Sequence, residues 1–194
     1  MNNLKVLFFF LLVSLFGFTS CEETTEVGEY DNWQERNITF IDSIATVARA
    51  NEDGNWKVIP ATGLDESKEH DNEYNVYCHV LQAGDGIEHP IYTDTVTVNY
   101  RGRLIPSDSH PKGYIFDSSY DGEFEPEFDV PVELGLNGTV QGFSTAIEHM
   151  VVGDTWRVYI PADLGYGAKV SAGIPAYSAL IFDINLVSFR RGKK

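Results

Sequence analysis

The sequence predicts an α+β fold in which several antiparallel strands pack against one principal helix. Segments that alternate apolar and polar residues recur between residues 76 and 189, and one segment among them, beginning at Gln141, has helical spacing. Of the 194 residues, 43% are hydrophobic and 13% aromatic, which is enough for one buried core. The net charge of −15 argues against nucleic acid as a partner, because the phosphate backbone would be repelled.

The first twenty residues have the pattern of an export signal. Lys5 precedes an apolar run, Val6 to Phe18, that is shorter than the roughly 20 residues of a spanning helix. The run ends in Phe18-Thr19-Ser20-Cys21, which resembles the lipobox of bacterial lipoproteins. That resemblance implies that residues 1–20 are a lipoprotein signal peptide and that Cys21 carries a lipid anchor. The protein is then expected in the bacterial cell envelope, on the periplasmic face or the cell surface; an ordinary secretory signal is the alternative.

Lipidation of Cys21 would leave Cys78 without an intramolecular partner, so a disulfide framework is not expected. Residues 21–31 are acidic and polar and suit a tether between the lipid and the first ordered element. The tether is followed by an extension, residues 32–72, that holds a predicted helix and an exposed loop.

The predicted helix spans residues 33 to about 50. Asp31 or Asn32 can cap it, and Ile41, Ile44, Ala45 and Ala48 recur at helical spacing. The apolar stripe is narrow, which favours packing on the same chain, or a stalk, over a dimerisation helix.

Residues 73–190 are expected to form one domain, followed by a basic tail at residues 191–194. The helix that begins at Gln141 is expected to end at Gly153. The segment 179–189 is apolar on both faces and therefore predicts a central strand. Further strands are expected at 56–59, 76–80, 95–101 and 155–160.

No metal site or cofactor is expected. The five histidines are scattered without zinc-ligand spacing, and glycine-rich phosphate loops are missing from the sequence. What remains is a set of aromatic residues at strand ends and loop tips, with one carboxylate, Asp117, beside Phe116.

These residues belong to a series of short motifs: Val98-Asn99-Tyr100-Arg101-Gly102, Phe116-Asp117-Ser118-Ser119, Val140-Gln141-Gly142-Phe143, Leu164-Gly165-Tyr166-Gly167, Gly173-Ile174-Pro175 and Leu180-Ile181-Phe182-Asp183. In this order, and with Ala83-Gly84-Asp85-Gly86 before them, the motifs resemble those of FKBP-type peptidyl-prolyl isomerases. The resemblance covers about residues 75–189. It implies an FKBP-like half-barrel, an antiparallel sheet of about five strands wrapped on one helix, here preceded by the N-terminal helix.

The family implies an apolar pocket that accepts proline-containing peptides or unfolded proteins, and macrolide inhibitors. Phe143 would be the pocket floor, where the family usually has Trp. The catalytic roles would fall to Tyr166, whose hydroxyl would donate to a substrate carbonyl, and to Asp117, hydrogen-bonded to Tyr100 at the rim. The substrate-binding residues would be Phe116, Val132, Val140, Phe143, Ile174 and Phe182.

The implied function is peptidyl-prolyl cis-trans isomerisation that assists protein folding outside the cytoplasm. Phe143 in place of Trp, and Val132 in place of an aromatic wall, predict a shallower pocket and slower turnover. Segments 106–113 and 120–130 are expected to flank the pocket. Two other functions stay open: a non-catalytic peptide- or partner-binding lipoprotein with the same cleft, and a glycan-handling lipoprotein that uses Trp33 and Trp56.

Overall fold

The structure is a computed structural model that describes residues 28–126 and 128–192. The predicted signal peptide, Cys21 and most of the tether lie outside these residues. Within the described ranges, no helix has both the length and the hydropathy needed to cross a membrane. The helices are α2 (Trp33–Ala50) and α3 (Gln141–Ile147), and the strands are β1 (Trp56–Pro60), β2 (Asn75–Gln82), β3 (Thr95–Arg103), β4 (Ile115–Ser118), β5 (Val132–Gly135), β6 (Thr155–Ile160) and β7 (Leu180–Arg190).

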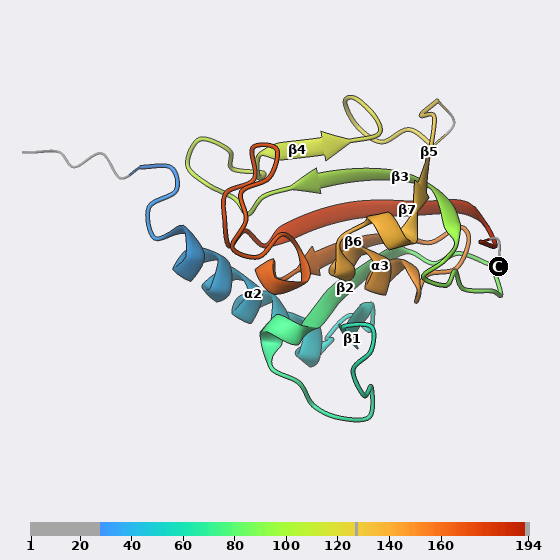
Figure 1. The fold of residues 1–194 in the computed structure, drawn as a ribbon, viewed down its shortest axis with the longest axis horizontal. Coiled ribbons are helices and arrows are strands. Elements are labelled where there is room, and N and C mark those ends of the chain that lie inside the picture. The colour runs from blue at the N-terminus through green and yellow to red at the C-terminus, as the bar shows by residue number, and fades with distance from the viewer. Residues whose placement is uncertain (1–27, 127, 193–194) are drawn as a thin grey trace, which may run out of the picture.

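The strands form one antiparallel sheet in the order β1-β2-β6-β7-β3-β4, and β5 also pairs with β3 (Figure 1). This confirms the predicted α+β class and the central position of β7. The sheet has seven strands rather than about five, for two reasons. β1 of the extension adds an edge strand, and β4 and β5 pair with successive parts of β3, so that they act as one edge strand interrupted by residues 119–131.

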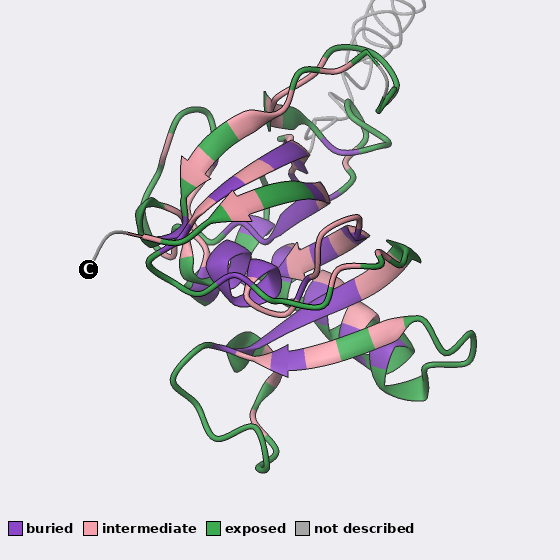
Figure 2. Ribbon diagram, turned by 90° about the vertical axis from the view of Figure 1, so that its right-hand side faces the viewer, coloured by how far each residue is buried: buried purple, intermediate pink, exposed green. Residues whose placement is uncertain are grey.

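The two helices cover opposite faces of the sheet. α3 packs in the concave face, where Val158 and Ile160 of β6 are fully buried (Figure 2). α2 packs on the other face, where Phe40 contacts the ring of Tyr159 and the Arg49 guanidinium lies over the ring of Tyr77. The strands between the helices are therefore buried on both sides.

The predicted N-terminal helix is confirmed, with the bounds 33–50, but its expected cap is wrong. Asn32 occupies the cap position in a left-handed conformation, φ 51°, and its side chain makes no capping hydrogen bond. The Asp31 carboxylate instead accepts from the backbone N–H of Gly28 at 2.8 Å. The buried side chains of the helix face the body of the protein, which confirms packing on the same chain: Trp33, Asn37, Ile41, Ala45 and Ala48.

The helix from Gln141 is shorter than expected. α3 ends at Ile147, after which the N–H groups of His149 and Met150 donate to carbonyls three residues back, at Ala146 and Ile147. These tighter turns still place Met150 in the core, where it is fully buried. Gly153, with φ +93°, then turns the chain into β6.

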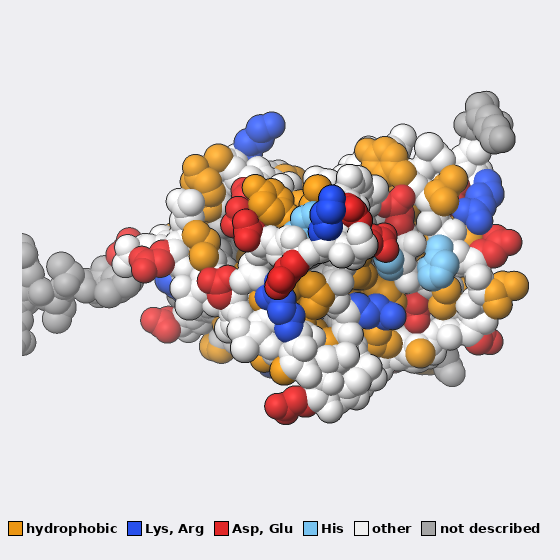
Figure 3. Space-filling model, turned by 90° about the horizontal axis from the view of Figure 1, so that it is seen from below, with side chains coloured by type: hydrophobic (Ala, Val, Ile, Leu, Met, Phe, Trp, Pro, Cys, Tyr) orange, Lys and Arg blue, Asp and Glu red, His pale blue; other side chains and the backbone are white. Residues whose placement is uncertain are grey.

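The start of the predicted basic tail is held against the domain. The Arg191 guanidinium pairs with Asp94 at 2.7 Å and with Glu88 at 3.0 Å, and the N–H of Gly192 donates to Asp94. On the face seen in Figure 3, acidic, basic and apolar side chains are interspersed, without a continuous basic stripe. This face therefore gives no support to nucleic-acid binding.

Candidate active site

Four aromatic side chains from four elements meet on the concave face of the sheet: Tyr100 of β3, Phe116 of β4, Phe143 of α3 and Phe182 of β7. Phe182 is central, with its ring centroid 5.1 Å from that of Phe143 and 5.5 Å from that of Phe116, both edge-on. The rings of Tyr100 and Phe143 are 6.1 Å apart. Phe143 and Phe182 are 3% and 6% exposed, whereas Tyr100 and Phe116 are half-buried. The cluster thus has a closed floor and more open walls.

Gly102 of β3 makes this cluster possible. A Cβ at this position would lie 2.5 Å from the ring of Phe116 and 2.7 Å from the ring of Phe182. Glycine inside a strand is typical of such a close approach. Gly102 lies in one of the sequence motifs, and its position inside a predicted strand is a signal from which this role could have been predicted.

An irregularity in strand pairing brings Phe116 and Asp117 to the same site. Asp117 pairs with Gly102, but the next pair along the two strands joins Ile115 to Arg103, so Phe116 has no partner in the register. A bulge of this kind redirects a side chain that regular alternation would send to the other face. Phe116 therefore contacts Phe182 while its neighbour Asp117 reaches Tyr100.

The expected hydrogen bond at the rim is present. The Tyr100 hydroxyl donates to the Asp117 carboxylate at 2.7 Å, and Asp117 itself is exposed. Partial burial raises the pKa of Tyr100 above its ordinary value, and the negative charge of Asp117 and the nearby Tyr166 phenol raise it further. The phenol of Tyr100 therefore stays protonated and remains a donor at neutral pH.

The loop between β6 and β7, residues 161–179, supplies two further predicted site residues, Tyr166 and Ile174. Ile174 is 2% exposed and is fixed by a β-bridge to Ser171. Tyr166 is 37% exposed and follows the short 3₁₀ helix Ala162–Leu164. The loop thus offers one buried apolar wall and one accessible phenol.

Val132 and Val140 are both half-buried and pack against the core. Val132 lies on β5 opposite Val98 of β3, and Val140 is the residue that precedes α3. The carbonyl of Val140 accepts from the N–H of Phe143 at 3.0 Å, which ties this position to the floor residue. The substrate-binding roles of the two valines stay predictions.

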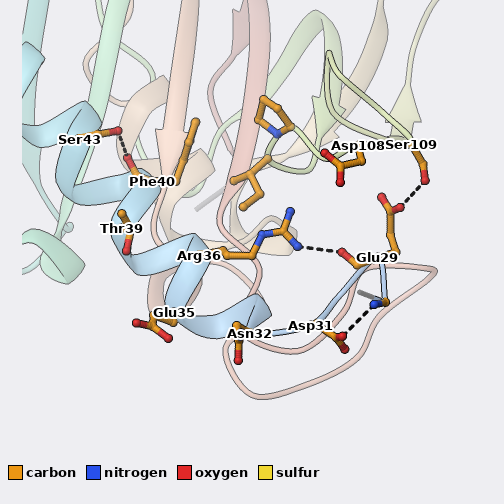
Figure 4. Close-up of a pocket in the computed structure, with 13 residues that line it drawn as sticks. Glu29, Asp31, Asn32, Glu35, Arg36, Thr39, Phe40, Ser43, Asp108 and Ser109 are labelled. Carbon is orange, nitrogen blue, oxygen red and sulfur yellow. Dashed lines mark hydrogen bonds between the residues drawn. The ribbon is translucent and has the colours of Figure 1, made fainter. Parts of the chain in front are cut away.

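The two long loops expected to flank the pocket have definite contacts. Segment 106–113 contacts the chain just before α2, where Ser107 and Ser109 donate to the Glu29 carboxylate. Glu29 and Ser109 line a cavity of about 820 Å³ (Figure 4). In segment 120–130, the Arg101 guanidinium lies over the ring of Tyr120 at 4.3 Å and donates to the carbonyl of Gly122. Their role beside the pocket stays a prediction.

The residues named for the other functions are placed differently. Trp33 is buried, with its indole N–H bonded to Ser178, and Trp56 stacks between His79 and Tyr159. Neither ring offers the open platform that the glycan hypothesis needs. Burial raises the pKa of the free Cys78 thiol, which makes it unreactive. Across residues 28–126 and 128–192, no three His, Cys, Asp or Glu side chains gather as a metal site would require.

The family is established by comparison with known sequences. Residues 86–187, more than half of the chain, match the model of the FKBP-type peptidyl-prolyl cis-trans isomerase family. The chain therefore belongs to this family, as the motifs predict.

Curated relatives include the peptidyl-prolyl cis-trans isomerase Mip of Coxiella burnetii, 39% identical over 113 residues, which are 58% of this chain and 44% of the relative. The FKBP-type 22 kDa isomerase of Escherichia coli is 36% identical, over 59% of this chain and 50% of its own. The outer membrane protein MIP of Legionella longbeachae is 34% identical, over 58% of this chain and 43% of the relative. The chain thus spans about half the length of these relatives.

Solved structures show the same fold. A peptidyl-prolyl isomerase from Pseudomonas syringae matches 84% of this chain and 98% of its own with a TM-score of 0.59 at 24% identity. FkpA from Escherichia coli matches 84% of this chain and 64% of its own, also with a TM-score of 0.59 at 24% identity. At this identity the likeness concerns the fold alone, and it agrees with the predicted FKBP-like architecture.

Proposed function

We propose that this protein is a peptidyl-prolyl cis-trans isomerase that assists protein folding outside the cytoplasm. The observation that carries the proposal is the aromatic cluster around Phe182, bordered by the hydrogen bond from Tyr100 to Asp117. An apolar floor with a polar rim suits a proline ring and the amide that precedes it. Membership of the isomerase family supports the same reaction.

The reaction needs a twisted amide rather than a new bond. Resonance keeps the peptide bond planar with a rotation barrier of about 18–20 kcal/mol. The twisted amide is less polar than the planar one, so a dry aromatic pocket stabilises it relative to water. An acceleration of about four powers of ten corresponds to roughly 5.5 kcal/mol, a magnitude that desolvation and two hydrogen bonds can supply. A nucleophile or a proton transfer is not required.

The polar residues would hold the substrate during the twist. We assign Tyr166, on its exposed loop, the donation of a hydrogen bond to a substrate carbonyl. Asp117 orients the Tyr100 hydroxyl at the rim. Phe143 forms the floor, and Phe116, Ile174, Phe182, Val132 and Val140 would line the rest of the pocket.

For the location, we propose the bacterial cell envelope with a lipid anchor on Cys21. The motif that ends at Cys21 supports an envelope protein, as does the relative from Legionella longbeachae, which is named as an outer membrane protein. Replacement of Cys21 by Ser should move the full-length protein from the membrane fraction to the soluble fraction of the producing bacterium. Retention of the variant in the membrane would contradict the anchor.

The function is tested by the rate of cis-trans isomerisation of a prolyl peptide with the purified protein, with and without a macrolide inhibitor. Catalysis that the macrolide abolishes is expected. Asp117→Asn should lower kcat/KM roughly tenfold, because the neutral amide orients Tyr100 less strongly. Asp121→Asn, at an exposed acid on the neighbouring loop, is the matched control and should leave the rate unchanged.

A non-catalytic binding module is the second candidate, favoured by the departures at Phe143 and Val132 from the family's aromatic residues. It predicts macrolide or peptide binding without acceleration of the isomerisation. That result would refute the proposed enzyme.

A further inference from the structure

The N-terminal helix α2 lies beside the loop 161–179 (Figure 1) and is hydrogen-bonded to it. This loop carries Tyr166 and Ile174. The indole N–H of Trp33 donates to the Ser178 hydroxyl at 2.8 Å, and the N–H of Ala179 donates to the side-chain carbonyl of Asn37, also at 2.8 Å. Trp33 is 7% exposed and Asn37 is 2% exposed. Two buried hydrogen bonds therefore connect residues that are more than 140 positions apart in the sequence.

These bonds continue toward both site residues of the loop. The Ser178 hydroxyl donates in turn to the carbonyl of Pro175 at 2.7 Å, and the N–H of Tyr177 donates to the carbonyl of Gly167 at 2.7 Å. Pro175 follows Ile174 in the chain, and Gly167 follows Tyr166. The two predicted site residues of the loop, Ile174 and Tyr166, are therefore each followed by a residue whose carbonyl accepts a hydrogen bond from within the loop.

The loop has a backbone that needs such support. Ala172 and Tyr177 have φ values of 41° and 59°, in the left-handed region that residues with a Cβ rarely adopt. Conformations of this kind persist where the surroundings hold them, and they concentrate at functional sites. Tyr177 immediately precedes Ser178 and Ala179, the two residues that α2 binds.

Side-chain packing leaves a gap at this junction. A cavity of about 250 Å³ separates part of α2 from the loop, and its lining includes Asn37, Ile38 and Ile41 on one side and Tyr177 and Ala179 on the other. The hydrogen bonds at Trp33 and Asn37 connect the two segments beside this cavity. α2 also lies outside residues 86–187, the part that matches the family model.

We propose that Trp33 and Asn37 are positioning residues, through which α2 holds the loop 161–179 in the conformation that presents Tyr166 and Ile174 to the substrate. The inference rests on the proposed isomerase function. When the bonds are removed, the loop occupies its competent conformation for a smaller fraction of time. Apparent affinity falls by that fraction, whereas the rate of the saturated enzyme is unchanged.

The test uses the full chain with three single variants. Trp33→Phe keeps an aromatic ring but removes the N–H, Ser178→Ala removes its acceptor, and Asn37→Leu removes the acceptor of Ala179. Each should raise KM and the macrolide dissociation constant by the same factor, about three- to tenfold, with kcat unchanged. Hydrogen exchange at the amides of Tyr177 and Ala179 should become faster.

Three further variants separate positioning from general destabilisation. The double variant of Trp33 and Ser178 should match Ser178→Ala alone, because Ser178→Ala already removes the bond from Trp33 as well as the bond to Pro175. Ala48→Gly lowers the stability of α2 away from the loop, and should lower the melting temperature without changing KM. Ser178→Thr keeps a hydroxyl at this position and, unlike Ser178→Ala, should have the wild-type KM.

Wild-type KM and macrolide affinity in both Trp33→Phe and Asn37→Leu would overturn the proposal, as would an equal rise of KM in Ala48→Gly. Failure of the isomerase function itself has a different signature. In that case the wild-type protein does not accelerate isomerisation, while macrolide affinity and amide exchange in the loop still report whether α2 positions it.

Discussion

The two sides of the candidate site are built in different ways. On one side, Phe143, Phe182 and Tyr100 project from a helix and two paired strands and belong to the hydrophobic core. On the other, Tyr166 and Ile174 lie on a loop that contains left-handed residues and is held by hydrogen bonds from α2. Residues of the first side therefore stabilise the fold as well as the site, whereas the loop is hydrogen-bonded to α2, which lies outside residues 86–187. Substitutions on the first side should cost stability, whereas a substitution at the accessible Tyr166 should cost activity alone. Ile174 is the exception on the loop, because it is 2% exposed and belongs to the core.

The largest effect is expected at Phe143. Phe143→Ala should lower the free energy of unfolding by about 3–5 kcal/mol, because it empties a buried aromatic position at the centre of the core. Isomerase activity should fall with it. Urea unfolding, followed by tryptophan fluorescence, measures the change.

Phe128→Ala is the matched control, because Phe128 is 77% exposed and should contribute within about 0.5 kcal/mol. If Phe143→Ala were as stable as this control, the floor of the site would not be part of the core, and the contrast between the two sides would disappear.

Gly102→Ala should have the next largest effect. The added methyl group would overlap the rings of Phe116 and Phe182 and should cost about 1–3 kcal/mol, while it also moves two walls of the site. Denaturation and macrolide titration of the same variant measure both consequences.

Gly138→Ala serves as the control, because a Cβ there meets nothing within 4 Å. This change should be neutral or slightly stabilising, since alanine restricts the unfolded chain. Equal free energies of unfolding for the two glycine variants would show that the close approach at Gly102 does not contribute to stability.

The loop side is tested by Tyr166→Phe. We expect kcat/KM to fall about tenfold, the effect of one hydrogen bond made to the substrate, with the free energy of unfolding changed by less than about 0.5 kcal/mol. The phenol is accessible and the ring is retained, so the fold should persist. Tyr92→Phe, at a tyrosine that is 48% exposed, is the control for loss of a hydroxyl. Wild-type turnover in Tyr166→Phe would remove the role assigned to this residue.

The sequence predicts the first side better than the second, for a physical reason. Val98 and Val158 follow from local alternation, and Phe143 follows from helical spacing, so much of the core and the floor of the aromatic cluster are encoded in short windows. The pairing of Asp117 with Tyr100 could be expected from the family motifs, and the structure contains it.

The remaining features depend on long-range geometry. The bulge that aims both Phe116 and Asp117 at the site is a property of two paired strands, not of either one. Trp33 suggested glycan binding because nothing near it in the sequence identifies Ser178 as its partner. Likewise, Asn37 resembles any polar residue of an exposed helix face until the loop packs on it.

The smallest effect concerns pH, at the rim where the two sides meet. Burial and Asp117 raise the pKa of Tyr100, so the phenol remains a donor and kcat/KM should be constant from about pH 7 to about pH 9.5. Above about pH 10, tyrosine ionises in the unfolded chain before it does so in the folded protein. The folded state then binds more protons, and stability must fall as pH rises. Tyr100→Phe removes this contribution, so its unfolding free energy should fall less steeply above pH 10 than that of the wild-type protein. Identical slopes in the two proteins would mean that folding does not shift the pKa of Tyr100. They would also contradict a stable hydrogen bond between Tyr100 and Asp117 at the rim of the site.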